Sequence, residues 1–392
     1  MTTQLTPEVT WTGVVDWSLR MFHSYAVPDG VTYNSYLIQD EQLTLVDTVK
    51  SSYASEFVHK LQQVVKIEDL KYLISLHAEP DHSGCIPTIF GLNPEIVIVC
   101  STPAQEILKT IYPQLKSANF MTVTNESTLS LGKNTLKFRM TPMQHWPESM
   151  GCSMGDILFS SDFFGQHLAS TERYVDDFDV FRVIMRMEDY AANIMNPFRV
   201  NVTKTIQYYA EQNYQHIFPA HGLCFQFDNC KVAFEVYIKF VEQKVKQNKV
   251  VVVYDSMYGS TAKAAQIVAQ GILSKGFEPV LLNAETSSNA EIAYALFKSR
   301  ALCVGSATLN NQMMPDLDAI LTYAGQLQHL KGMKFCAFGG CCWAGTALTQ
   351  IVNKLNEFGA ECVGQFGWIL KCDDQQLQHL FELGQKIVEA LE

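Results

Sequence analysis

A motif of four potential metal ligands most constrains what this chain can fold into. The apolar run of residues 72–76 leads directly into His77, Glu79, Asp81 and His82, which fall within six residues. Such side chains at the mouth of a predicted buried strand are typical of one side of a two-metal site. Their mixture of imidazole and carboxylate suits iron or manganese better than metals that prefer thiolate. The alternative is a polar turn that happens to hold charged residues.

Three later residues of the same chemical types could complete this site. His145, Asp162 and His221 each stand at or just beyond the end of an apolar segment. Side chains at the carboxyl ends of neighbouring strands converge in space. Any one of the three alone would more often be a structural histidine or a turn aspartate. Together with the first motif they predict a shared site.

The first half of the chain alternates short apolar runs with turns. Strands are expected at 32–38, 43–48, 72–76 and 96–100, and apolar residues recur at helical spacing over 51–65. Alternating helices and strands indicate a layered α/β domain.

A second fold is expected to start after a predicted helix at 234–248. The β-branched run 250–255 is typical of a central parallel strand. The turn 256–261 contains glycine and hydroxyl residues and precedes another predicted helix, so its backbone N–H groups could hold a phosphate. No Gly-Lys-Ser/Thr follows, which excludes a nucleotide-triphosphate loop. The sequence predicts two domains, 1–247 and 248–392.

Two further loops follow predicted strands of the same sheet, at 301–305 and 334–338. Loops at the carboxyl ends of parallel strands bind ligands in doubly wound folds. The pattern resembles flavodoxin, in which such loops hold the phosphate and ring of FMN. For Trp343 the alternative is a surface or core aromatic. The resemblance implies FMN contacts from Ser256, Met257, Tyr258, Gly259, Ser260, Thr261, Ser306, Ala307, Thr308, Leu309, Asn310, Gly339, Gly340, Cys341, Cys342, Trp343 and Gly345.

Composition limits the partners and the compartment. A formal charge of -11 leaves no basic surface for a nucleic acid, and no long apolar run or signal peptide points to a membrane or to secretion. The eleven cysteines form no Cys-x-x-Cys pair, which argues against a disulfide framework, a rubredoxin-like module or an iron–sulfur module. A cytoplasmic protein with mostly buried thiols is expected.

The order of the metal motifs resembles the metallo-β-lactamase superfamily, with one departure. Glu79 stands where the hydrolases of that superfamily carry a second histidine. Carboxylate ligands stabilise higher oxidation states, which a redox-active pair of irons needs and a zinc hydrolase does not. The departure therefore points from hydrolysis toward redox chemistry.

Both halves together resemble the flavodiiron proteins over essentially the whole chain. The resemblance implies an N-terminal metallo-β-lactamase-like αββα sandwich and a C-terminal flavodoxin-like doubly wound parallel sheet. It also implies that one iron takes His77, Glu79 and His145, that the other takes Asp81, His82 and His221, and that Asp162 bridges them.

The family resemblance implies that the protein reduces O2 to water, with electrons passing through FMN. The electron donor would be a separate rubredoxin-like protein or flavin reductase, because the chain lacks Cys-x-x-Cys and any further domain. A head-to-tail homodimer, or a dimer of such dimers, would bring the FMN of one subunit to the irons of the other. An oxygen-detoxifying role is expected.

Three other functions remain open from the sequence. The nearest is NO reduction to N2O at the same site. A zinc hydrolase that uses its flavodoxin half for docking, and a flavin electron carrier with a vestigial metal site, come from other classes. The complete set of ligands argues against the last two.

Two residues are expected near the substrate on the strength of the family resemblance. His23 matches a position near the metal pocket and would contact substrate or deliver protons, unless it is a core histidine bonded to backbone. Tyr190 would contribute a pocket hydroxyl, although Ala191 stands where the family often has a second tyrosine. For Cys341 and Cys342, two small residues beneath a flavin are favoured over a redox role.

Overall fold

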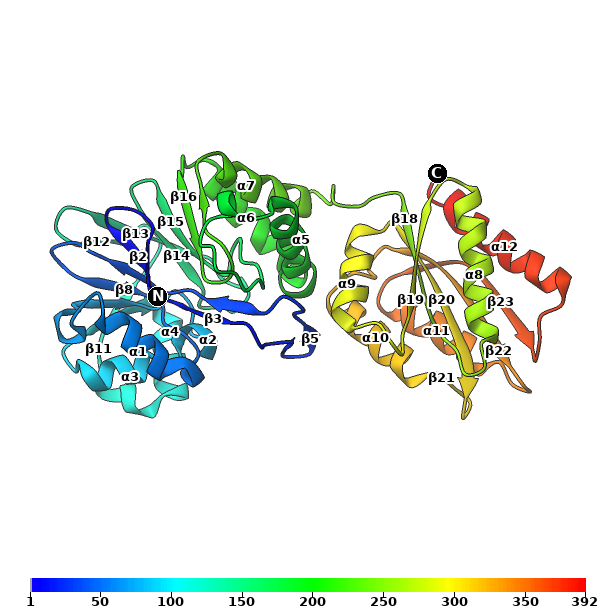
Figure 1. Ribbon diagram of the computed structural model, residues 1–392. Coiled ribbons are helices and arrows are strands. Elements are labelled where there is room, and N and C mark those ends of the chain that lie inside the picture. The colour runs from blue at the N-terminus through cyan, green and yellow to red at the C-terminus, as the bar shows by residue number, and fades with distance from the viewer. Residues whose placement is uncertain (1) are drawn as a thin grey trace. The chain divides into compact units, whose positions relative to one another are not determined.

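The computed structural model describes residues 2–392 as two compact units (Figure 1). The first contains the chain up to Phe22, Val27–Ala191 and Phe198–Glu242, and the second contains His23–Ala26, Ala192–Pro197 and Gln243–Glu392. None of the helices in residues 2–392 has the length and apolar character needed to cross a bilayer.

Two large β-sheets form the first unit. The seven-stranded sheet has the order β1-β2-β7-β8-β9-β10-β11, and the six-stranded sheet has the order β12-β13-β14-β15-β16-β17. The first sheet contains β1 (Thr3–Gln4), β2 (Val9–Trp11), β7 (Tyr36–Ile38), β8 (Thr44–Val46), β9 (Tyr72–Ile74), β10 (Val97–Ser101) and β11 (Asn119–Val123). The second contains β12 (Thr128–Ser130), β13 (Thr135–Met140), β14 (Met150–Met154), β15 (Ile157–Ser161), β16 (His216–Pro219) and β17 (Phe225–Gln226). Four short strands lie outside these sheets and form two pairs. The strand β3 (Val14–Asp16) pairs with β6 (Val31–Tyr33), and β4 (Met21–Phe22) pairs with β5 (Tyr25–Ala26).

The inner faces of these two sheets pack into one apolar core. Ile38 and Val99 of the first sheet and Phe138 and Phe159 of the second are fully buried members of it. Helices cover the outer faces, α1–α4 along one sheet and α5–α7 along the other (Figure 1). Their bounds are α1 (Ala54–Gln62), α2 (Pro80–Ser83), α3 (Ile86–Leu92), α4 (Thr102–Ile111), α5 (Val180–Tyr190), α6 (Arg199–Ala210) and α7 (Asp228–Val241). The unit is the expected αββα sandwich.

Some predicted elements were wrong in their limits. The single strand expected at 32–38 is two strands, β6 and β7, because Asn34 and Ser35 lie between residues that pair with different sheets. The helix expected at 234–248 is α7, which begins and ends earlier.

The second unit is a five-stranded parallel sheet in the order β19-β18-β20-β22-β23. The first strand in sequence lies second in space, which is the flavodoxin-like arrangement. The strands are β18 (Lys249–Asp255), β19 (Glu278–Asn283), β20 (Ala301–Leu309), β22 (Lys334–Cys341) and β23 (Glu361–Ile369), and β21 (Gln312–Met313) pairs with β20.

Helices cover both faces of this sheet. The side chains of β18 alternate, so that Val250 and Val252 face one core while Val251 and Val253 face the other. The first core includes residues of α8 (Ser260–Ser274) and α12 (Asp374–Glu389). The second includes residues of α9 (Asn289–Lys298), α10 (Pro315–Gln326) and α11 (Thr346–Glu357). A doubly wound sheet places its ligand loops at the carboxyl ends of the strands.

Close contact between α8 and α12 depends on glycine. A Cβ atom on Gly384 would overlap the carbonyl oxygen of Val268, which belongs to the backbone and cannot rotate away. We expect Gly384→Ala to lower the free energy of unfolding by about 1–3 kcal/mol, as overpacking does. Urea unfolding of the full chain, followed by circular dichroism, measures this effect. Gly91→Ala in α3 is the control, because its Cβ atom meets nothing within 4 Å. Equal losses in both variants would contradict the prediction.

Candidate metal centre and flavin-binding loops

The predicted metal ligands of the first unit lie at the ends of strands from both sheets. His77 follows β9, and Glu79 immediately precedes α2, which carries Asp81 and His82. Asp162 and His221 follow β15 and β16, which are parallel neighbours, so their side chains converge as expected.

The structure brings all seven predicted ligands into two groups. His77, Glu79, His145 and Asp162 form the first group, and Asp81, His82 and His221 form the second. Within each group, one potential ligand atom from each residue lies within 4.8 Å of the others. Six of the seven residues are buried, and His145 is partly exposed.

Asp162 belongs to the first group but also faces the second, with one carboxylate oxygen toward the histidines of each. Its Oδ2 atom is 3.5 Å from Nε2 of His77 and 3.7 Å from Nε2 of His145. Its Oδ1 atom is 3.3 Å from Nε2 of both His82 and His221. A carboxylate in this arrangement can bridge two metal ions.

Backbone and side-chain acceptors fix the orientation of two imidazoles. Nδ1 of His221 donates to the carbonyl oxygen of Thr32 at 2.7 Å, and Nδ1 of His77 lies 2.7 Å from Oε1 of Glu148. A nitrogen that faces a carbonyl or carboxylate must carry the proton. The Nε2 lone pairs of the neutral rings therefore point into the two groups, as metal ligation requires.

The second group and the bridging carboxylate contain buried polar atoms with no hydrogen-bond partner among residues 2–392. These atoms are both carboxylate oxygens of Asp81, both of Asp162, and Nε2 of His82. Buried charged atoms are costly unless they are paired or bind a metal. The donor set therefore fits two hard or borderline divalent cations.

In the absence of metal, protons take the place of cations at this site. Burial lowers the pKa of His77, but hydrogen bonds to Glu148 and Glu79 outweigh it and raise the pKa to about 9. Burial also opposes protonation of His82 and His221, yet Asp81 and Asp162 raise their pKa values to about 9 and about 10.

A metal ion must displace these protons, so we expect its apparent affinity to rise with pH. At pH 6 the three imidazoles are protonated in the metal-free protein, and metal binding releases the protons. Between pH 6 and 8 the affinity should rise about tenfold per pH unit for each proton displaced. Competition with a chelator of known pH dependence measures this slope. An affinity independent of pH would contradict the prediction.

Sequence reasoning missed two carboxylates beside the predicted ligands. Glu148 is buried, and its Oε1 atom also accepts from the backbone N–H of Ala78 at 3.0 Å. Asp47 is buried at the end of β8 and accepts from the N–H of Leu76 at 2.8 Å; burial raises its pKa to about 6. Asp47 had a signal, since it ends a predicted strand. Glu148 had none, because it follows His145 in a segment without periodicity.

The two residues predicted near the substrate have different surroundings. Tyr190, at the end of α5, is buried, with its ring 6.4 Å from that of His221. Beside both rings lies a histidine that the sequence did not single out, His167, whose ring is 5.0 Å from Tyr190 and 5.3 Å from His221. His23 is exposed and belongs to the second unit. The roles of Tyr190 and His23 stay predictions.

Of the three predicted flavin loops, only the first begins beyond its strand, because β20 continues to Leu309 and β22 continues to Cys341. The loop after β18 turns at Gly259, whose positive φ of 81° favours glycine, and enters α8 at Ser260. The ends of β20, β22 and β23, together with the loop after β22, border a pocket of about 200 Å³. Its walls are Thr308, Gly339, Cys341, Trp343, Gly345, Leu348, Gly367, Trp368 and Ile369.

These loops fit a flat aromatic ligand with a phosphate group. Trp343 and Tyr258 are 81% and 93% exposed, so two large rings stand uncovered in the same set of loops. A Cβ atom on Gly340 would lie 2.9 Å from the ring of Trp368, which lines this pocket, so a side chain at position 340 would have to displace that ring. Ser260 and Thr261 begin α8, and Oγ of Ser256 accepts from the N–H of Ala262 in its first turn, so hydroxyl residues gather at a helix N-terminus, where a phosphate binds favourably.

Comparison with known families agrees with the fold of each of the two units. Residues 31–222 match the ODP family beta lactamase, and residues 252–384 match Flavodoxin.

The similarity to individual proteins extends over almost the whole chain. The nitric oxide reductase of Moorella thermoacetica is 33% identical over 99% of this chain and 98% of its own. The rubredoxin-oxygen oxidoreductase of Megalodesulfovibrio gigas is 34% identical over 88% of this chain and 87% of its own. The crystal structure of the flavodiiron protein from Giardia intestinalis has a TM-score of 0.96 at 33% identity and covers 99% of this chain and 96% of that chain. This chain therefore belongs to the flavodiiron protein family.

Proposed function

We propose that this protein reduces O2 to water at two iron ions, with electrons that pass through FMN from a separate carrier protein. The observation that carries the proposal is the position of Asp162, which presents one oxygen to each of two groups of ligands. The likeness to a rubredoxin-oxygen oxidoreductase over 88% of the chain supports the same reaction.

In this proposal His77, Glu79 and His145 would hold the first iron, Asp81, His82 and His221 would hold the second, and Asp162 would serve both. Bound iron and FMN would supply the redox chemistry that the reduction of the gas needs.

The chain's own residues prepare this chemistry. Glu148 and Thr32 hold two imidazoles in the tautomer that ligates metal, and burial excludes bulk water from the bridging carboxylate. Tyr190, whose ring lies 6.4 Å from that of His221, is proposed as a substrate contact. His23 is proposed as a second substrate contact or proton donor.

The partner proteins follow from the chemistry of electron supply. We propose a rubredoxin-type donor or a flavin reductase, and a head-to-tail homodimer or a dimer of such dimers that sets FMN of one subunit close to the irons of the other. A fully active monomer in solution would contradict the dimer. We place the protein in the cytoplasm, because its eleven cysteines are unpaired thiols, as a reducing compartment favours.

Reduction of NO to N2O is the second candidate. The nitric oxide reductase of Moorella thermoacetica matches this chain over nearly its full length, so its activity is a direct alternative on the same site.

One anaerobic experiment separates these functions. The iron-loaded, FMN-loaded protein is reduced, and its consumption of O2 and of NO is measured under matched conditions. Faster turnover of O2 supports the proposal, and faster turnover of NO favours the alternative. A protein isolated with zinc but no iron, with hydrolase activity and no gas reduction, would overturn both.

A further inference from the structure

The second flavin loop is a β-hairpin. Strands β20 and β21 pair antiparallel, with Thr308 opposite Met313 and Leu309 opposite Gln312. The two residues between them, Asn310 and Asn311, have positive φ angles of 49° and 61°. Two asparagines in this conformation form the tight turn that joins antiparallel strands. The predicted flavin contacts Thr308, Leu309 and Asn310 are therefore part of one small ribbon.

A single side chain from α11 holds the outer edge of this hairpin. Oε1 of Gln350 accepts from the backbone N–H of Met313 at 2.8 Å, and its Nε2 donates to the carbonyl oxygen of Asn311 at 3.1 Å. Nε2 also donates to Oε1 of Gln312 at 2.7 Å. A primary amide offers an acceptor and two donors, so it can satisfy a strand edge much as a neighbouring peptide group would.

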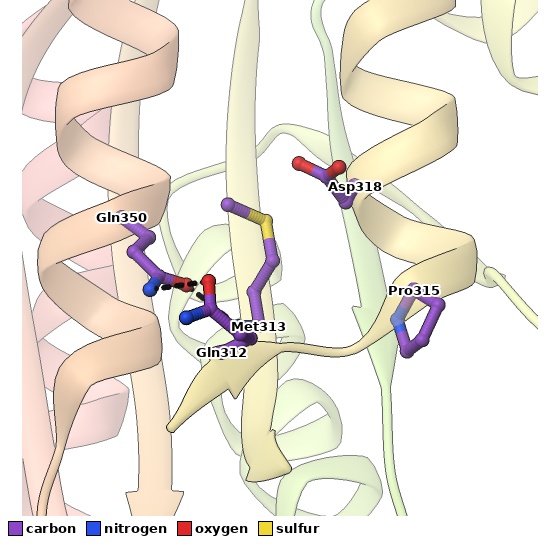
Figure 2. A pocket seen from close by; sticks show the side chains of 5 residues that line it. All are labelled: Gln312, Met313, Pro315, Asp318 and Gln350. Carbon is purple, nitrogen blue, oxygen red and sulfur yellow. Dashed lines mark hydrogen bonds between the residues drawn. The ribbon is translucent and has the colours of Figure 1, made fainter. Parts of the chain in front are cut away.

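Open space beside the hairpin increases the importance of this contact. Gln350 points from α11 toward Gln312, and both side chains line a pocket of about 410 Å³ (Figure 2). The residues that line this pocket are Gln312, Met313, Pro315, Asp318 and Gln350. On the other strand of the hairpin, β20, Thr308 borders the proposed flavin pocket. A two-stranded ribbon is marginally stable by itself, so its geometry depends on what holds it.

We propose that Gln350 is a positioning residue for the flavin. It fixes the hairpin in the conformation that meets the cofactor, and so contributes to FMN affinity and to the reduction potential of the bound flavin. The inference rests on the proposed flavin site and adds a residue that lies outside the three loops.

The test uses the full-length chain, stripped of flavin and titrated with FMN at 25 °C. Quenching of FMN fluorescence gives the dissociation constant, and circular dichroism confirms that each variant is folded. Gln350→Ala should weaken FMN binding roughly tenfold, because three hydrogen bonds that preorganise the hairpin are lost. It should also shift the midpoint potential of the bound flavin. Asn353→Ala, an exposed position on the same helix, should change neither quantity.

A second substitution keeps the inference testable if the alanine variant misfolds. Gln350→Glu keeps the acceptor for Met313 but replaces the donor with an oxygen that faces the carbonyl of Asn311, so it should also weaken FMN binding. A dissociation constant within twofold of wild type in the folded variants, with an unchanged potential, would overturn the inference even if thermal stability fell. A wild-type chain that binds no FMN would instead overturn the flavin site itself, and the role of Gln350 with it.

Discussion

Asp162→Ala is expected to abolish gas reduction and to remove most of the iron from the protein. The substitution deletes both carboxylate oxygens of Asp162. Its Oδ1 atom faces the imidazoles of His82 and His221, and its Oδ2 atom faces those of His77 and His145. Loss of a residue that only orients a metal ligand costs about 10–100-fold in affinity or activity. A carboxylate that serves both ions should therefore cost more than about 100-fold.

Iron content and turnover are measured separately for this variant. Iron per chain is determined after reconstitution, and O2 and NO consumption are measured with the reduced protein. Asp156→Ala is the matched control, because Asp156 precedes the same strand, β15, and is exposed. Wild-type iron content and turnover in Asp162→Ala would refute the bridging role. Retained gas reduction without iron would favour a flavin carrier whose metal site is vestigial.

The convergence of the metal ligands could be predicted from the sequence because strand ends are visible in it. Asp162 and His221 each follow a short apolar run, and the parallel pairing of β15 with β16 then brings the two side chains together. Glu79 was recognised from its spacing within one short motif. Both inferences need only local patterns and one general rule about sheets.

Features that depend on packing between distant segments could not be predicted in this way. Asn34 interrupts the strand expected at 32–38, and its side-chain amide donates to the carbonyl oxygens of Pro219 and Gly222 at 2.8 and 3.0 Å. These bonds hold the segment that carries His221, almost two hundred residues away. Apolar periodicity carries no information about such a partner.

The second flavin loop shows a local signal that was overlooked. The apolar run that ends at residue 305 predicts a loop after it, whereas β20 continues to Leu309 and turns back into β21. Adjacent asparagines tolerate positive φ and often form two-residue turns. Asn310 and Asn311 therefore predict a hairpin, but the clamp from Gln350 depends on the position of α11 and could not be foreseen.

The missed carboxylates change the charge balance of the metal centre. Five buried carboxylates surround it, and they carry five negative charges when ionised, against four positive charges from two ferrous ions. They are Asp47, Glu79, Asp81, Glu148 and Asp162. The remaining negative charge would favour ferric over ferrous ions and so would lower the reduction potential of a bound pair. The structure thus strengthens the argument that Glu79 first suggested, that the site suits redox chemistry better than hydrolysis.

Glu148→Ala is expected to weaken iron binding in the first group and to lower turnover by about 10–100-fold. The buried carboxylate accepts from Nδ1 of His77 at 2.7 Å and from the N–H of Ala78 at 3.0 Å, both at its Oε1 atom. Its removal leaves two buried donors without this acceptor, and the ring of His77 is free to turn or to change tautomer. One residue would thus disturb both a ligand and the backbone that follows it.

Glu148→Gln separates orientation from charge at this position. Its carbonyl oxygen can still accept both hydrogen bonds, so the geometry of His77 should survive while the negative charge is lost. We therefore expect Glu148→Gln to bind two irons per chain but to have a higher reduction potential, whereas Glu148→Ala loses iron chiefly from the group that contains His77. Redox titration and iron analysis give these quantities, and Glu106→Ala, an exposed site on α4, is the control. If Glu148→Ala kept both irons and normal turnover, the orientation of His77 would have to come from the packing of its ring against Trp146, which lies 5.2 Å away.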